Sequence, residues 1–165
     1  ADITWKEDDA RAGLNGLKAA RAIGMLSYRH YSGFAQSQSE KSTQVLEDFR
    51  AATYQRYQGE KLAKRFNAFT YWLLSKMMDS HNVGRGKESV AEALRSIKAK
   101  ALIISIDSDI LFPPEEQEFL AKHIPDAQLQ TLSSAYGHDG FLVEYTTFKD
   151  IIKNFYQPTL HKVSV

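Results

Sequence analysis

The sequence predicts an α/β fold in which a helical region precedes a small parallel sheet. Residues 1–98 contain no proline and space their apolar side chains at helical intervals. Residues 101–106, ALIISI, form a continuous apolar run of the kind found in buried parallel strands. Residues 128–132, QLQTL, alternate polar and apolar side chains as a second strand does. Because a helix-forming segment separates the two runs and another follows them, the pattern indicates a parallel sheet.

Four helices are expected in residues 1–98. Leu14, Leu17 and Tyr31 belong to a helical row that predicts a helix within residues 13–34. The polar stretch 35–43, AQSQSEKST, predicts a loop. The other elements expected in this region are a helix from residue 45 to about residue 57, a helix over 66–78, a loop over 81–87 and a short helix over 89–97.

Two helices are expected in residues 99–156. Pro113 and Pro114, followed by two acids, suit the first turn of a helix that extends to about His123, since proline lacks an N–H and the helix dipole favours negative charge there. Residues 140–156 space aromatic and aliphatic side chains as one long amphipathic helix does. We therefore expect a helical region at 1–98, an α/β region at 99–156 and a loosely held tail at 157–165.

The composition excludes several classes of protein. The chain has 165 residues, of which 43% are hydrophobic and 25% charged, and this suits one domain or half of a larger one. The net charge of +1 argues against a dominant nucleic-acid surface. The absence of cysteine excludes a thiol nucleophile and a cysteine-ligated metal. No apolar run approaches the roughly 18–20 residues of a membrane helix, and no signal peptide opens the chain, so we expect a cytoplasmic protein.

Polar clusters follow both expected strands. Residues 107–109, DSD, come directly after the first strand, and residues 136–139, YGHD, come soon after the second. Because parallel strands end at the same edge of a sheet, both clusters are expected there. A carboxylate from the first cluster can orient the imidazole of His138 and leave its other nitrogen to act as a base. Asp107 and Asp109 are both candidates for that acid, and the alternative role of Asp107 is to cap a turn.

The chain lacks a recognisable nucleophile. Acid before histidine is the order of the Ser…Asp…His triad of α/β-hydrolases, in which the serine lies in a G-x-S-x-G turn. This sequence contains no such turn, and neither Ser32 nor the pair at 133–134 has the flanking glycines. No histidines are spaced as in H-E-x-x-H, so no metal is expected. We interpret the chain as the C-terminal part of a larger enzyme whose nucleophile lies outside it.

Several stretches of the chain resemble the C-terminal segment of homoserine O-acetyltransferases, which are enzymes of methionine biosynthesis. They are GLKAARAIGMLSYRHY, YQGEKLAKRFNAFTYWLLSKMMDSHNV, ALRSIKAKALIISIDSDILFPPEEQ and SAYGHDGFLVEY, in the family's order and from about Gly13 to Tyr156. The resemblance implies the C-terminal part of an α/β-hydrolase fold with a helical lid subdomain. The lid would be residues 1–98, and residues 99–156 would be the last two strands and helices of the core.

The resemblance implies a role for five residues. Asp109, in SDILFP, matches the triad acid, and His138, in YGHDGFL, matches the triad base. Asp139 matches an acidic residue that holds the amino group of homoserine. Arg65 and Tyr71, in RFNAFTY, match substrate-binding residues of the lid, and a guanidinium suits a substrate carboxylate.

Three of these residues also have a structural interpretation. Asp139 lies where a helix starting at residue 140 needs an N-cap. Arg65 is close to two lysines and fits an exposed surface, while Tyr71 fits the packed face of its helix. The family usually has RFDA where this chain has Asn67, which puts in doubt any role assigned to that carboxylate.

The resemblance further implies a ping-pong reaction. A serine outside this chain would take acetyl from acetyl-CoA, and the hydroxyl of L-homoserine would take it from the serine, with no bound cofactor. The implied partners are the missing N-terminal half of the enzyme, on which activity depends, and a second copy in a homodimer formed by lid helices. No nucleic acid and no membrane are expected. The alternatives are transfer from succinyl-CoA or to serine, an esterase that gives the acyl group to water, and a truncated helical fragment that binds partners without catalysis.

Overall fold

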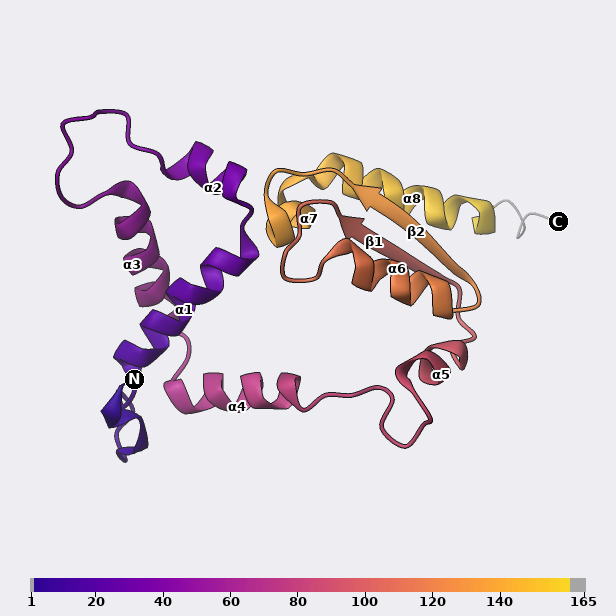
Figure 1. The fold of residues 1–165 in the computed structure, drawn as a ribbon, viewed down its shortest axis with the longest axis horizontal. Coiled ribbons are helices and arrows are strands. Elements are labelled where there is room, and N and C mark those ends of the chain that lie inside the picture. The colour runs from indigo at the N-terminus through magenta and orange to yellow at the C-terminus, as the bar shows by residue number, and fades with distance from the viewer. Residues whose placement is uncertain (1, 161–165) are drawn as a thin grey trace. The chain divides into compact units, whose positions relative to one another are not determined.

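The computed structural model describes residues 2–160 and divides into two compact units (Figure 1). The first comprises Ala1–Ser27 and Phe34–His81, and the second comprises Tyr28–Gly33 and Asn82–Val165. The expected boundary at 98/99 lies inside the second unit, because Leu94 packs with Ile103 and Ile124 in its core. No helix among residues 2–160 is long and apolar enough to cross a membrane.

The first unit is helical, as the sequence predicts. Gly59 allows two of its helices to approach closely, because a Cβ there would lie 3.1 Å from the carbonyl oxygen of Lys18. An ion pair of 2.7 Å between Lys18 and Glu60 joins the same two helices. The helices that contain residues of this unit are α1 (Leu14–Tyr28), α2 (Tyr31–Gln38), α3 (Arg50–Ala63) and α4 (Ala68–Asp79), after a short 3-10 helix η1 (Ile3–Lys6).

Two expected helices of this region differ from the structure. The helix expected within 13–34 is broken at residues 29–30, and the Gly33 N–H donates instead to the Ala135 carbonyl at 3.1 Å. The helix expected from Val45 starts only at Arg50, because Asp48 has a φ of 51° and so lies outside the helical region. Since α2 extends to Gln38 and α3 begins at Arg50, the polar loop starts and ends later than the predicted range 35–43.

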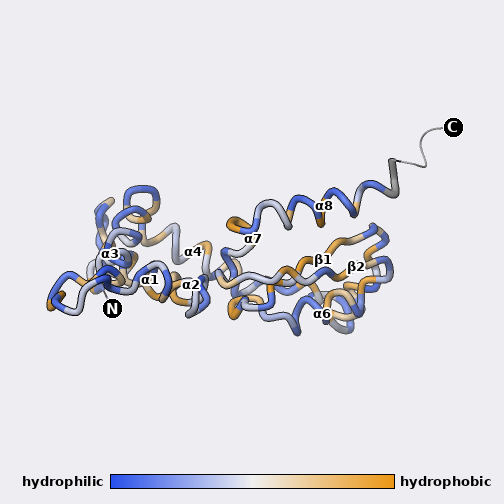
Figure 2. The backbone as a smooth tube through the Cα atoms, turned by 90° about the horizontal axis from the view of Figure 1, so that it is seen from above, coloured by the Kyte–Doolittle hydropathy of each residue, from blue (hydrophilic) through white to orange (hydrophobic). Residues whose placement is uncertain are grey.

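The second unit is built on two parallel strands. β1 (Ala101–Ile106) pairs with β2 (Ala127–Leu132) in a register that joins Ala101 to Ala127 and Ile106 to Leu132. Two helices, α6 (Pro114–His123) and α8 (Tyr145–Leu160), lie on opposite faces of this sheet in both views (Figures 1 and 2). The remaining elements of this unit are α5 (Val90–Arg95), a 3-10 helix η2 (Gly137–Asp139) and α7 (Gly140–Val143).

The core of the second unit uses the apolar residues of β1. Ile103 packs with Leu94 of α5 and Ile124 after α6, while Leu102 and Ile104 point to the other face because side chains alternate along a strand. Because the two strands are parallel, both end at the same edge of the sheet, where residues 107–109 follow β1 and residues 133–139 follow β2. The sequence predicted both strands and the start of α6 correctly.

The helix expected over 140–156 is interrupted. Glu144 separates α7 from α8 with a φ of −81° and a ψ of 44°. Its carboxylate accepts a hydrogen bond of 3.1 Å from the Ser134 hydroxyl, so a contact with the loop after β2 accompanies the break. α8 carries both polar and apolar residues along its length, as Figure 2 shows. Residues 157–160 of the expected tail continue α8, and residues 161–165 lie outside the described residues.

Candidate active site

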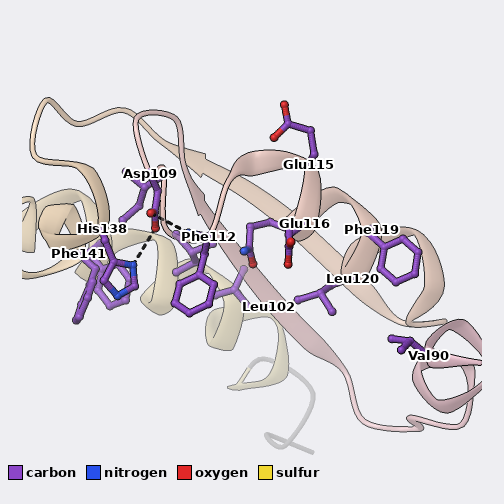
Figure 3. A pocket seen from close by; sticks show the side chains of 14 residues that line it. Val90, Leu102, Asp109, Phe112, Glu115, Glu116, Phe119, Leu120, His138 and Phe141 are labelled. Atoms are coloured by element: carbon purple, nitrogen blue, oxygen red, sulfur yellow. Dashed lines mark hydrogen bonds and ion pairs between the residues drawn. The ribbon is translucent and has the colours of Figure 1, made fainter. Parts of the chain in front are cut away.

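Asp109 and His138 meet at the carboxyl edge of the sheet. His138 Nδ1 lies 2.9 Å from Asp109 Oδ2 (Figure 3). The other carboxylate oxygen of Asp109 accepts backbone N–H groups from Leu111 at 2.8 Å and Phe112 at 3.0 Å. The carboxylate is 7% exposed and is therefore held by its own turn in a sheltered position. An Nδ1–H that donates to this carboxylate leaves Nε2 with a lone pair, which is the state of a general base.

Aromatic side chains surround the imidazole. The ring of Phe112 lies 5.2 Å from that of His138 between centroids, Tyr28 lies at 5.8 Å and Phe141 at 5.9 Å. The His138 side chain is 28% exposed, so these rings shelter it only in part. A half-open imidazole that is fixed on one side can exchange a proton with a group on its open side.

A hollow of about 990 Å³ lies beside this pair. Most of its lining residues are apolar and come from several elements, among them β1 and α6, and Figure 3 shows Asp109 and His138 at one end of it. Its lining residues are Val90, Leu102, Ile104, Ile106, Asp109, Phe112, Glu115, Glu116, Gln117, Phe119, Leu120, His138, Phe141 and Phe148. The volume and lining suit an acyl or substrate chain, or an apolar element of a longer polypeptide.

The carboxylate of Asp107 is hydrogen-bonded to the loop after β2 and not to His138. Its carboxylate accepts the Ser134 N–H at 3.1 Å. The Ser133 hydroxyl and the Ser134 N–H hold the pKa of the Asp107 carboxyl below its usual range, because these hydrogen bonds favour the charged form. Next to it, the Ser108 hydroxyl donates to the Ser134 carbonyl at 2.5 Å and accepts the Gly137 N–H at 3.0 Å. Asp107 and Ser108 therefore tie together the two loops that carry Asp109 and His138.

The lowered pKa of Asp107 predicts a change of stability with pH. Its contribution to the free energy of unfolding is present above the unfolded value of 3.8 and is lost as the pH falls through the lower folded value. Urea unfolding between about pH 2 and pH 7 should show wild type more stable than Asp107→Asn at neutral pH, with the difference shrinking below about pH 4. A difference that stays constant over this range would contradict the assignment.

Asp139 pairs with an arginine instead of capping the next helix. It occupies the N-cap position of α7, but its side chain makes no capping hydrogen bond. Its Oδ2 accepts instead from Arg29 Nε at 3.1 Å. The capping role considered for Asp139 is therefore wrong, since the carboxylate is turned toward Arg29.

Sequence reasoning missed the segment 28–33, which lies against the histidine loop. Gly137 has a φ of 62°, and a Cβ there would lie 2.7 Å from the backbone nitrogen of His30. A Cβ at Gly33 would likewise lie 2.6 Å from the Ala135 carbonyl oxygen. Glycine is needed at both positions because two backbone segments touch. No spacing rule could find this contact, since its partners are more than a hundred residues apart in the chain.

Arg65 and Tyr71 lie in the first unit. Arg65 is exposed in the turn between α3 and α4. Tyr71 is half-buried and lines a second hollow of about 430 Å³, together with Trp5 and Trp72. Their assigned roles in substrate binding stay predictions. Asn67 accepts the Thr70 N–H at 2.7 Å as the N-cap of α4, and since aspartate caps helices equally well, the departure from RFDA preserves the local structure.

Within residues 2–160, no group of three or more histidine, aspartate or glutamate side chains is placed to hold a metal ion. The functional groups that this site does hold are the carboxylate of Asp109 and the imidazole of His138. That pair can accept a proton from a nucleophile and return it to a leaving group.

Two curated relatives match almost the entire chain. A homoserine O-acetyltransferase from Cyclobacterium marinum is 51% identical over 156 residues, which are 94% of this chain. Another, from Trichormus variabilis, is 42% identical over 160 residues and 95% of this chain. Each match covers 44% of the relative, so the chain spans less than half the length of the curated relatives it matches. No family model matches the chain.

Solved structures show the same fold. Esterase E22 matches with a TM-score of 0.76 at 22% identity, over 91% of this chain and 45% of its own. A homoserine O-acetyltransferase from Staphylococcus aureus matches with a TM-score of 0.69 at 26% identity, over 87% of this chain and 41% of its own. The expected α/β-hydrolase fold is thereby confirmed for the part that this chain spans. By homology along nearly its whole length, the chain belongs to the homoserine O-acetyltransferase family.

Proposed function

We propose that this chain supplies the acid, the base and part of the substrate pocket of an enzyme that transfers acetyl from acetyl-CoA to the hydroxyl of L-homoserine. The observation that carries the proposal is the 2.9 Å contact of His138 with Asp109 at the edge where two parallel strands end. The homology to homoserine O-acetyltransferases supports the choice of acyl group and acceptor. Acetyl-CoA acts as a co-substrate, and the reaction needs no bound cofactor.

His138 carries the proton in both halves of the reaction. It takes the proton of a serine hydroxyl while that oxygen attacks the thioester carbonyl of acetyl-CoA, and gives it to the leaving thiolate. It then takes the proton of the homoserine hydroxyl, which attacks the acetyl-serine ester, and returns it to the serine oxygen. Asp109 holds the ring in place and stabilises the imidazolium in each half.

The serine belongs to polypeptide that this chain does not span. Within the described residues, β1 pairs only with β2, and a two-stranded sheet has little stability alone. Apolar β1 side chains line the hollow beside His138, so the sheet has a surface on which further structure can pack. We use the term complete enzyme for this chain joined to the remaining half of the relatives' length, and we expect activity only there.

Three side chains are proposed to bind the acceptor. Arg65 would hold the homoserine carboxylate through its planar guanidinium, Asp139 would attract the ammonium group, and Tyr71 would line the pocket. The exposed apolar residues of α4, among them Met77 and Met78, support the expectation that a second copy covers this helix in a homodimer.

The release of CoA tests the proposed reaction. The complete enzyme is incubated with acetyl-CoA, with and without L-homoserine, and CoA and O-acetylhomoserine are both measured. Beyond the one equivalent of CoA per enzyme that acylation releases, we expect CoA release to depend on homoserine and to equal the O-acetylhomoserine formed. Release that is unaffected by homoserine would instead favour an esterase that gives the acyl group to water. Faster turnover with succinyl-CoA, or with serine as acceptor, would correct the substrate and keep the mechanism.

A further inference from the structure

We propose that Arg29 is a positioning residue, whose ion pair with Asp139 holds His138 in register with Asp109. The proposal rests on the proposed function, since it assigns His138 the role of base. Arg29 lies at the break between α1 and α2, and its Nε donates to Asp139 Oδ2 at 3.1 Å. Asp139 follows His138 directly in the chain, so an ion pair that fixes the carboxylate of Asp139 also restrains the backbone of His138.

The rest of the segment 28–33 contacts the same loop on both sides of His138. Before the histidine, the Gly33 N–H donates to the Ala135 carbonyl at 3.1 Å. At the histidine itself, the ring of Tyr28 lies 5.8 Å from the imidazole. After it comes the ion pair of Arg29 with Asp139. The segment thus holds the loop by a backbone bond, a ring contact and a charge pair.

The histidine loop needs such support because its own structure is short. His138 lies in the 3-10 helix η2, which has three residues and therefore little intrinsic stability. The side chains of Arg29 and Asp139 are 25% and 21% exposed, so their pairing is partly sheltered from water. Small displacements of a catalytic group cost large factors in rate, and the pair limits how far this loop can shift.

The test is Arg29→Gln in the complete enzyme, with the two half-reactions measured separately. Acylation is followed by the burst of p-nitrophenol from p-nitrophenyl acetate, and transfer by the decay of the acetyl-enzyme with homoserine. Because His138 serves both steps, we expect both rates to fall by a similar factor of about ten, with the melting temperature unchanged. Arg29→Lys, which keeps the charge, should recover part of the loss.

Two further variants complete the experiment. Arg56→Gln removes an exposed ion pair with Asp48, where the two side chains are 61% and 83% exposed, and should leave both rates within about twofold of wild type. Adding Arg29→Gln to His138→Ala should have no further effect on acylation, because Arg29 acts through the imidazole.

Other results would overturn the proposal. A raised KM for homoserine with normal acylation would mean that Arg29 serves acceptor binding. If both rates of Arg29→Gln fell only together with its melting temperature, the ion pair with Asp139 would have a merely structural role. If neither rate fell, the ion pair would not position His138. If the wild-type enzyme reacts with p-nitrophenyl acetate but its acetyl group is never transferred to homoserine, the proposed function fails. The acylation rates of wild type and Arg29→Gln would still show whether Arg29 positions His138.

Discussion

Replacing His138 with alanine in the complete enzyme is expected to lower kcat for acetyl transfer by about 10⁴-fold or more. The imidazole is the group that we propose takes the serine proton, and its Nδ1 lies 2.9 Å from the Asp109 carboxylate. Without it, the serine would have to attack in its weakly nucleophilic neutral form. Stopped assays of CoA release, with melting curves to show that the variant is folded, would measure the loss.

The matched control is His123→Ala. His123 lies at the end of α6, where its ring lies 4.3 Å from that of Phe119 and its Nδ1 is 2.8 Å from the Phe119 carbonyl oxygen. This variant should keep activity within about twofold, since surface substitutions away from a site have small effects. A His138→Ala variant that is folded and loses less than about tenfold would show that His138 is not the base.

The second large effect is expected for Asp109→Asn. The substitution keeps the size of the side chain but removes the charge that stabilises the imidazolium, and an amide that donates to Nδ1 selects the wrong tautomer. We expect kcat to fall by about 10³- to 10⁴-fold with little change in the KM for homoserine. Steady-state assays of acetyl transfer, with melting curves to show that the variant is folded, would measure the loss.

Asp107→Asn is the control for that variant. Both aspartates follow β1, but Asp107 accepts the Ser134 N–H, a bond that an asparagine oxygen can still accept. Its kcat should stay within a few-fold of wild type at neutral pH. If Asp107→Asn lost more activity than Asp109→Asn, the assignment of the acid would be reversed.

The elements that the sequence predicts correctly are those whose formation depends on residues within the element itself or next to it. ALIISI forms β1 over its whole length, because a short continuous apolar run suits a parallel strand that is covered on both faces. α6 begins at Pro114 because the fixed φ of proline and the two acids that follow suit a first turn. Such causes act within a few residues, so they can be found without a structure.

The breaks in the predicted helices have distant causes. The interruption at residues 29–30 coincides with a backbone bond from Gly33 to Ala135, and the interruption at Glu144 with a bond from Ser134. In both regions the apolar spacing continues through the break, so periodicity alone predicts an unbroken helix. Tertiary contacts override a local preference of this kind, which amounts to only a fraction of a kcal/mol per residue.

By itself, the sequence determined the α/β class, the strands, and the order of an acid and a histidine at their ends. Position relative to the strand left Asp107 and Asp109 both open and the family resemblance implied Asp109, while only the tertiary structure showed its carboxylate against His138 and the ion pair of Arg29 with Asp139. The reason is geometric: the two aspartates are two residues apart, and which carboxylate faces the ring depends on how the turn between them folds. A contact across 110 residues leaves no trace in the spacing of a single sequence.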